Sequence, residues 1–282
     1  MSKVIACANT KGGVGKTTVA LSLAECSAYL GRRTLVIDLD LQINASTTLV
    51  GDSGEPWKIG NTVEDYFRAR QRNQPTSPNS LVTPINDNLH LLSGKLSIVL
   101  FERELLAQGG APFAANTNVA AWLEELLAAL RPHYSLIVFD TPPGLSILSE
   151  CAIRAADLVI VPQIPDRLSS QGIEVYATYL MDHLGLDAIG EKSTVLINMV
   201  PPRNTKIATR YIKEIVALAG VGAFPYRLFT TRYPDSTLFR GAMEREGRGR
   251  FFSWWGKMDA NVIAATRELW SFLGEPLDQT RR

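Results

Sequence analysis

The feature that most constrains this chain is a glycine-rich loop, Lys-Gly-Gly-Val-Gly-Lys-Thr-Thr, at residues 11–18. An apolar run at Val4–Ala8 precedes the loop, and a helix-like stretch at Val19–Leu30 follows it. In this setting the glycines allow a tight turn whose backbone N–H groups, with the positive end of the helix dipole, face a phosphate. The loop therefore predicts binding of a nucleoside triphosphate. The alternative, a glycine-rich turn without a ligand, is disfavoured by the Gly-Lys-Thr-Thr ending.

The two lysines of the loop are expected to have different tasks. Lys16 would reach the β- and γ-phosphates, and the Thr17 hydroxyl would ligate Mg²⁺. Lys11 cannot easily fold back onto phosphates held by Lys16, but it can extend toward a nucleotide in a facing subunit and neutralise charge there, as an arginine finger does. The alternative is a solvated lysine at the loop entrance. The residues expected to contact the nucleotide are Lys11, Gly12, Gly13, Val14, Gly15, Lys16, Thr17 and Thr18.

Carboxylates that follow two apolar runs complete the predicted site. Asp38 and Asp40 come at the end of the run Thr34–Asp38, and in extended geometry they project to the same side. Asp38 suits a contact to Mg²⁺ through water and Asp40 suits orientation of the attacking water; the alternative is that the pair caps a turn. Asp140 ends the run Leu136–Asp140 and stands where phosphate-loop enzymes carry their second metal-binding element.

Short β-branched runs alternate with helical patterns along the chain, and several runs are apolar almost throughout, as in strands buried on both faces. This predicts an α/β fold, a mostly parallel twisted sheet with helices on both faces, in a single domain over residues 1–282. Residues 51–86, rich in Gly, Pro, Asn and Ser, are expected to form an insertion at the rim, with one helix around Val63–Arg72. The predicted strands are Val4–Ala8, Thr34–Asp38, Leu89–Ser93, Leu136–Asp140, Leu158–Pro162 and Thr194–Met199, and the helical patterns between them include Val119–Leu130, Ile147–Ala155 and Gln171–Leu184.

Composition argues against several other classes of protein. The sequence has no run of about 18 apolar residues, and it begins without the pattern of a signal peptide, so we expect a cytoplasmic protein. Cys7, Cys26 and Cys151 lie singly in apolar segments and are expected to be buried small hydrophobic residues. The three histidines lack metal-ligand spacing.

With these motifs the chain resembles the ParA/MinD family of deviant Walker A ATPases, and within it the ParA-type partition ATPases. The resemblance rests on the lysine-first loop, on Asp-x-Asp-x-Gln-x-Asn-Ala at residues 38–45, on Asp140-Thr141-Pro142-Pro143, and on Val161-Pro162-Gln163 with Gly172. It implies ATP and Mg²⁺ as cofactors and an ATP-bound sandwich homodimer in which Lys11 contacts the partner's nucleotide. Together with the residue analysis, it assigns catalysis to Lys11, Lys16 and Asp40, and metal binding to Thr17, Asp38 and Asp140.

The resemblance also implies a biological role. In such proteins the ATP dimer binds DNA without sequence preference, and a ParB-like or other adaptor protein stimulates slow hydrolysis, so that a plasmid, a chromosome region or another large cargo moves over the nucleoid. This chain departs from the family pattern where Leu41 replaces the usual proline and Ile43 the usual glycine. The family's adenine-contacting segment is not recognisable; Phe229 and Thr231 fall at about that place and are the residues expected near the base.

Charge is unevenly distributed along the chain. From Pro201 onward there are 14 Lys/Arg against 8 Asp/Glu, and in the first 200 residues 15 against 20. A basic final third suggests a polyanionic partner, DNA before membrane, although an ordinary solvated surface is the alternative. The basic residues expected to bind DNA, four of them at helical spacing, are Arg203, Lys206, Arg210, Lys213, Arg232, Arg240 and Arg245.

Two other functions remain open. A MinD-like membrane-cycling ATPase is the main alternative, but the predicted helix Ala260–Leu273 lacks the Lys/Arg-rich polar face that membrane targeting needs, so no stable membrane association is expected. A metabolic ATPase or metal-cluster carrier of the superfamily would carry paired cysteines. The aromatic cluster Phe251, Phe252, Trp254 and Trp255 is expected to pack in the core, with a membrane or partner contact as the alternative.

Overall fold

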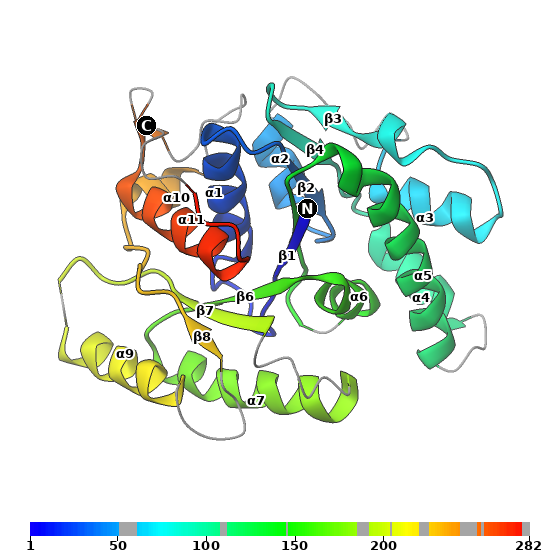
Figure 1. The fold of residues 1–282 in the computed structure, drawn as a ribbon. Coiled ribbons are helices and arrows are strands. Elements are labelled where there is room, and N and C mark those ends of the chain that lie inside the picture. The colour runs from blue at the N-terminus through cyan, green and yellow to red at the C-terminus, as the bar shows by residue number, and fades with distance from the viewer. Residues whose placement is uncertain are drawn as a thin grey trace.

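A computed structural model of the chain describes residues 1–50, 61–107, 112–144, 146–184, 192–203, 205–219, 226–242, 253–254 and 257–277. At its centre is an eight-stranded sheet (Figure 1). The strands are β1 (Lys3–Cys7), β2 (Thr34–Asp38), β3 (Thr83–Pro84), β4 (Leu89–Leu92), β5 (Leu136–Asp140), β6 (Leu158–Gln163), β7 (Ser193–Ile197) and β8 (Arg227–Leu228). They lie in the order β3-β4-β2-β5-β1-β6-β7-β8, and all neighbours are parallel except the β3–β4 pair at the edge.

Helices cover both faces of this sheet because the central strands are apolar on both sides. Along β1, Val4 and Ala6 pack into one hydrophobic layer, and Ile5 and Cys7 pack into the other. The first layer is completed by α3 (Val63–Gln71), α4 (Ile98–Ala107), α5 (Pro112–Leu130), α6 (Ile147–Ala155), α7 (Arg167–Leu184) and α9 (Lys206–Leu218). The second is completed by α1 (Lys16–Tyr29), α2 (Asn44–Val50), α10 (Thr237–Ala242) and α11 (Ala260–Phe272). The predicted fold class is confirmed.

All six predicted strands are present: two have the predicted bounds, and four have ends shifted by one or two residues. The prediction omits β3 and β8, because strands of two residues carry no periodicity. It also omits α4, where four consecutive apolar residues at 98–101 hide the helical period.

The described part of the predicted rim insertion, residues 61–86, packs onto the body of the protein. It contains α3, a 3₁₀ turn at Pro78–Leu81 and the edge strand β3. Thr62 begins α3 with a reciprocal capping box to Asp65, and Phe67 stacks on Phe101 of α4 with ring centroids 5.8 Å apart. Residues 51–60 lie outside the described part of the chain, and the single-domain assignment stays a prediction.

Three further expectations concern burial and the C-terminal third. Cys7, Cys26 and Cys151 are buried free thiols, as predicted. Of the helices within the described ranges, none combines the length and the hydrophobicity needed to cross a bilayer. The predicted aromatic cluster lies mostly outside the described residues: only the backbone of Trp254 is described, in a small hairpin of β9 (Ser253–Trp254) and β10 (Lys257–Met258).

Candidate nucleotide-binding site

The glycine-rich loop joins β1 to α1 and is braced from the far side by β7. Gly13 and Gly15 have φ angles of 74° and 84°, in the left-handed region that favours glycine, and α1 begins directly afterwards at Lys16. A Cβ atom at Gly15 would overlap the side-chain amide of Asn198, which lies just beyond β7. That amide donates a hydrogen bond to the Val14 carbonyl at 2.9 Å. The loop therefore holds the conformation of a phosphate-binding turn.

Lys16 is held inside the mouth of the loop. Only 6% of the residue is exposed, and its Nζ donates to the Lys11 carbonyl at 3.3 Å. Burial lowers the pKa of Lys16, while the nearby Asp140 and Asp40 carboxylates oppose that shift. An ammonium with one weak hydrogen bond and two nearby carboxylates is suited to contact phosphate oxygens.

Asp140 lies at the carboxyl end of β5, between the ends of β1 and β2, where its register partners are Cys7 and Asp38. It is completely buried, and neither of its carboxylate oxygens has a hydrogen-bond donor among the described residues. Burial raises the pKa of Asp140 well above its ordinary value, Asp38 raises it further, and the nearby Thr17 hydroxyl opposes the shift. A buried carboxylate without donors fits an electrostatic partner such as Mg²⁺, which prefers oxygen ligands.

Asp38, by contrast, is surrounded by donors. Its Oδ1 accepts from the Asp40 amide at 3.1 Å, and its Oδ2 accepts from the amide and the hydroxyl of Ser46 at 2.8 and 2.7 Å. Burial raises the pKa of Asp38 to about 6, and these hydrogen bonds keep it from rising further. The structure thus gives Asp38 the turn-capping geometry that the sequence left open as an alternative.

Asp40 lies further toward the site entrance and close to Lys16. Its Oδ1 accepts from the Gln42 amide at 2.9 Å. Burial raises the pKa of Asp40, and the Gln42 hydrogen bond and the charge of Lys16 lower it. The other oxygen of this carboxylate has no hydrogen-bond donor among the described residues, which suits contact with a water molecule.

Lys11 makes an ion pair within its own chain. Its Nζ donates to Asp166 at 2.9 and 3.2 Å and to the Ser169 hydroxyl at 3.0 Å, at the start of α7. Asp166 also accepts from the Ser169 amide at 2.7 Å, so the carboxylate caps the helix and holds the lysine at once. Partial burial raises the pKa of Asp166, but the Lys11 and Ser169 donors bring it below its ordinary value. The predicted reach of Lys11 into a facing subunit requires this pair to open.

The residues predicted to contact the base have other partners. Phe229 is buried and packs edge-on against Phe272 of α11, with ring centroids 5.0 Å apart. A nucleotide contact by Phe229 stays a prediction. Thr231 is half-buried, and its amide donates to Glu268 at 2.9 Å while its hydroxyl bonds to the same carboxylate. A base contact by Thr231 stays a prediction.

The predicted DNA-binding residues are partly described. Arg203, Lys206, Arg210, Lys213 and Arg232 are exposed. Three of them, Lys206, Arg210 and Lys213, lie on α9 and line an open depression of about 510 Å³ together with Thr209 and Glu214. Arg210 pairs with Glu214 at 2.8 Å. The side chain of Arg240 and the whole of Arg245 lie outside the described residues.

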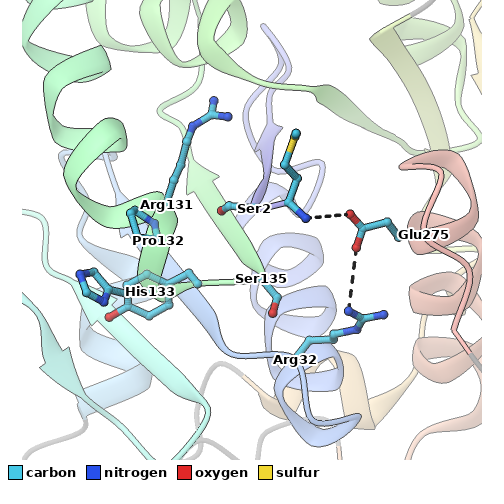
Figure 2. Close-up of a pocket in the computed structure, with 9 residues that line it drawn as sticks. Ser2, Arg32, Arg131, Pro132, His133, Ser135 and Glu275 are labelled. Atoms are coloured by element: carbon cyan, nitrogen blue, oxygen red, sulfur yellow. Dashed lines mark hydrogen bonds and ion pairs between the residues drawn. The ribbon is translucent and has the colours of Figure 1, made fainter.

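A second cavity lies at the opposite, amino-terminal edge of the sheet (Figure 2). It has a volume of about 410 Å³ and is lined by segments that precede β1, β2 and β5, among them Ser2, Arg32 and Arg131. Glu275 crosses its mouth and pairs with the N-terminal amine at 3.5 Å and with Arg32 at 3.9 Å. It shares no residue with the glycine-rich loop, so it is separate from the nucleotide site.

Four functional residues escaped the sequence analysis: Asn198, Ser46, Asp166 and Ser169. Asn198 follows an apolar strand in the same way as Asp38 and Asp140, so the carboxyl-edge rule that found those aspartates also points to it. Ser46, Asp166 and Ser169 follow no such rule, since their partners are distant in the sequence or lie across a turn.

The sequence and the fold are both similar to those of known proteins. A profile of the AAA domain family matches residues 2–183. The sporulation initiation inhibitor protein Soj of Bacillus subtilis is 28% identical over 218 residues, 76% of this chain and 79% of that protein. The chromosome-partitioning ATPase Soj of Thermus thermophilus is 37% identical over 170 residues, 60% of this chain and 57% of that protein. The fold is similar to that of Cyanothece McdA in complex with ATP, with a TM-score of 0.76, 20% identity and 97% of each chain covered.

Because the two carboxylates differ in their donors, replacement of Asp140 and replacement of Asp38 by asparagine are expected to have opposite effects on stability. Asp140→Asn removes a buried charge without donors and is expected to raise the free energy of unfolding of the nucleotide-free protein at pH 7.5 by about 1–3 kcal/mol. Asp38→Asn places an NH₂ group where an oxygen accepted hydrogen bonds and is expected to lower it by a similar amount. Urea denaturation without Mg²⁺ or nucleotide measures both; equal destabilisation by the two variants would contradict the geometry.

Proposed function

We propose that this protein is an ATP-driven positioning ATPase. The chain belongs to the ParA/MinD family of deviant Walker A ATPases and, within it, to the ParA-type partition group. Its ATP-bound homodimer binds DNA without sequence preference, and an adaptor protein stimulates hydrolysis to segregate a plasmid, a chromosome region or another large cargo. The observation that carries the proposal is the buried Asp140 carboxylate without donors, placed beside Thr17 and Lys16 at the mouth of the loop.

The described residues fit ATP and Mg²⁺. The loop amides and Lys16 bind the phosphates, while the Thr17 hydroxyl and Asp140 hold the metal, directly or through water. The bound ion neutralises phosphate charge. Asp40 orients the attacking water and accepts its proton through the oxygen that Gln42 does not engage. The nucleotide base is expected near Phe229 and Thr231, as the family resemblance implies.

The proposed dimer rests on the ion pair of Lys11 with Asp166. In the free protomer its ammonium is held by Asp166 in a pair whose side chains are 30% and 43% exposed. Pairs so open to water contribute less than about 1 kcal/mol, so a triphosphate in a facing subunit can draw the lysine away. Lys11 then stabilises charge on the partner's transferred phosphoryl group.

Dimerisation should respond to both members of this pair. Lys11→Ala is expected to bind ATP and stay monomeric. Asp166→Asn keeps an oxygen to cap Ser169 but loses the charge that holds Lys11. Because each dimer opens two such pairs, each contributing up to about 1 kcal/mol, half-dimerisation is expected at a protein concentration up to about 30-fold lower. Sedimentation with a slowly hydrolysed ATP analogue measures this, with Glu125→Gln, which breaks the exposed pair with Arg70, as a control. ATP-dependent dimers of Lys11→Ala at wild-type concentration would rule out action in the partner's site.

Substitution of Asp40 should stop ATP hydrolysis without preventing ATP binding. Asp40→Ala is expected to retain ATP binding and dimerisation and to lose at least about 100-fold in turnover, which leaves a long-lived dimer on DNA. Lys16→Ala is expected to abolish ATP binding in calorimetry, because no other described side chain is buried at the phosphate position with a positive charge. Wild-type turnover by Asp40→Ala excludes it as the hydrolytic carboxylate, and micromolar ATP binding by Lys16→Ala contradicts the loop assignment.

DNA binding is assigned to the basic residues around α9. An Arg203→Ala/Arg210→Ala variant is expected to bind random-sequence DNA more weakly in the presence of ATP, with the slope of log affinity against log salt smaller by about two. Filter binding at increasing salt tests this. A matched control is Arg72→Ala/Arg103→Ala, which removes two exposed arginines from α3 and α4 at the other edge of the sheet. An unchanged slope in the first variant, or an equal loss in both, removes α9 as the DNA site.

A further inference from the structure

Ser46, in the first turn of α2, connects the end of β2 to the segment that follows β4. Its hydroxyl donates to Asp38 Oδ2 at 2.7 Å and accepts from the Gly94 amide at 2.9 Å. Its own amide donates to the same Asp38 oxygen at 2.8 Å. All three residues are buried or closely packed, so this is a fixed junction between two neighbouring strands.

Close packing at Gly94 reinforces the junction. A Cβ atom there would lie 3.0 Å from the Asp38 carbonyl oxygen, 3.1 Å from Asp38 Cγ and 3.2 Å from Ile43 Cγ2, so a side chain would displace its neighbours. Ile43 itself has a φ of 48°, in the left-handed region that β-branched residues avoid. Such a conformation persists only where the surroundings over-determine it, and here Gly94 and the 38–46 turn do so.

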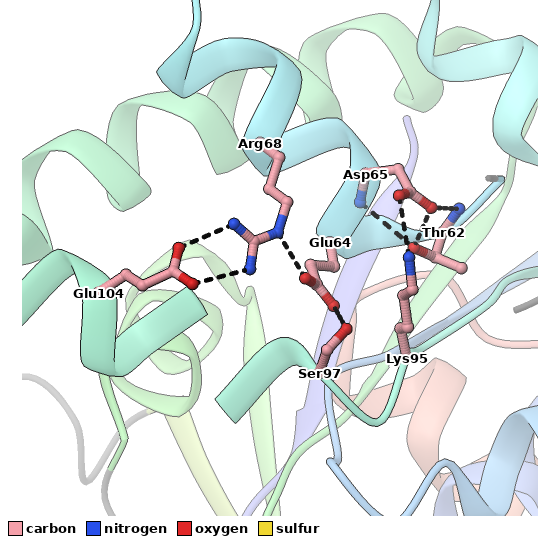
Figure 3. Close-up of polar contacts among 7 residues, drawn as sticks. All are labelled: Thr62, Glu64, Asp65, Arg68, Lys95, Ser97 and Glu104. Carbon is pink, nitrogen blue, oxygen red and sulfur yellow. Dashed lines mark hydrogen bonds and ion pairs between the residues drawn. The ribbon is translucent and has the colours of Figure 1, made fainter. Parts of the chain in front are cut away.

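The segment that carries Gly94 is in turn anchored on the rim (Figure 3). The Val63 amide donates to the Ser93 carbonyl at 2.9 Å, and Lys95 pairs with Asp65 at 3.3 Å. Ser97 donates to the buried Glu64 carboxylate, which also pairs with Arg68 of the same helix. The Gly94 amide is therefore presented to Ser46 from a rigid support.

The other oxygen of Asp38, Oδ1, begins a set of hydrogen bonds around Asp40, the proposed hydrolytic carboxylate. Asp38 Oδ1 accepts from the Asp40 amide at 3.1 Å, Asp40 Oδ1 accepts from the Gln42 amide at 2.9 Å, and the Asp40 carbonyl accepts from the Ile43 amide at 2.9 Å. These bonds close successive turns around Asp40. The place of the Asp40 carboxylate is thus set by Asp38, and the place of Asp38 is set by Ser46.

We propose that Asp38 is a positioning residue and not a magnesium ligand: with Ser46 and the Gly94 amide it fixes the backbone that presents Asp40 to the attacking water. Both of its oxygens are already occupied by three donors, whereas those of Asp140 have none. Three of the roughly four acceptor positions of this carboxylate are thus taken by protein donors, which leaves little room for a metal ion. The proposal deepens the assignment of ATP hydrolysis and rests on it for its catalytic consequence.

The positioning part can be tested without nucleotide. Ser46→Ala removes the hydroxyl that joins Asp38 to Gly94 and leaves the Ser46 amide in place. Hydrogen exchange of the Asp40 and Gln42 amides is expected to be at least ten-fold faster in this variant, while the core strands β1 and β5 exchange at wild-type rates. Ser80→Ala, which removes an exposed hydroxyl that bonds only Ser77, is the matched control and should change nothing. Unchanged exchange at Asp40 and Gln42 in Ser46→Ala would overturn the proposal.

The metal part is tested with Mg²⁺ and a fluorescent ATP analogue. For Asp38→Asn and Ser46→Ala, the Mg²⁺ concentration at half-maximal nucleotide binding is expected within two-fold of wild type, with turnover at least ten-fold lower for both; for Asp140→Asn the Mg²⁺ requirement is expected to rise at least ten-fold. A rise in Asp38→Asn equal to that in Asp140→Asn overturns the proposal. If wild-type protein binds no ATP analogue, the proposed function fails, and the hydrogen-exchange result still decides whether Asp38 and Ser46 position Asp40.

Discussion

Burial of carboxylates at the carboxyl edge of a parallel sheet is the constraint on which the rest of this structure depends. Asp38 and Asp140 are register partners on neighbouring strands, both fully buried, with Asp40 and Lys16 close by. Desolvation disfavours their charges, and each carboxylate meets that cost differently. Asp38 has three donors, Asp40 has one donor and the charge of Lys16, and the Asp140 carboxylate has no donor within hydrogen-bond geometry among the described residues, with the Thr17 hydroxyl nearby. Asp140, whose buried carboxylate has the fewest stabilising contacts, is therefore the one beside which a cation fits.

The centre of the sheet could be predicted from local patterns, because the apolar residues that mark a strand also show that both of its faces are covered. The Leu136–Phe139 segment is apolar at every position, which excludes a half-exposed strand, and its neighbours β1 and β2 are equally apolar, so helices must cover both faces. The edges were less predictable. Pro84 joins an antiparallel edge strand of two residues, and its place depends on pairing with His90 across a turn and not on any period. Hence the centre of the sheet was predicted and its margins were not.

In the site, residues whose type is required directly beside a strand were predictable, and residues that act through a distant partner were not. The glycine-rich loop and Asp140 could be found because a phosphate or a metal demands those residue types next to a strand. Asp166 holds Lys11 across 155 positions of the sequence, and Asn198 braces Val14 across 184. Asp38 shows a subtler limit: the sequence places it beside Asp140, but only its donors separate a turn cap from a metal ligand.

The hydrogen bonds around Asp38 and the ion pair of Lys11 differ in how costly they are to break. The Asp38–Ser46–Gly94 junction is buried, so breaking it would leave donors and acceptors without partners. The Lys11–Asp166 pair is open to water, so its loss costs little, and solvent replaces each partner. In the proposed dimer, a triphosphate from which a second protomer excludes water would attract Lys11 more strongly than one carboxylate does. Release of the lysine would then be tied to assembly of the dimer.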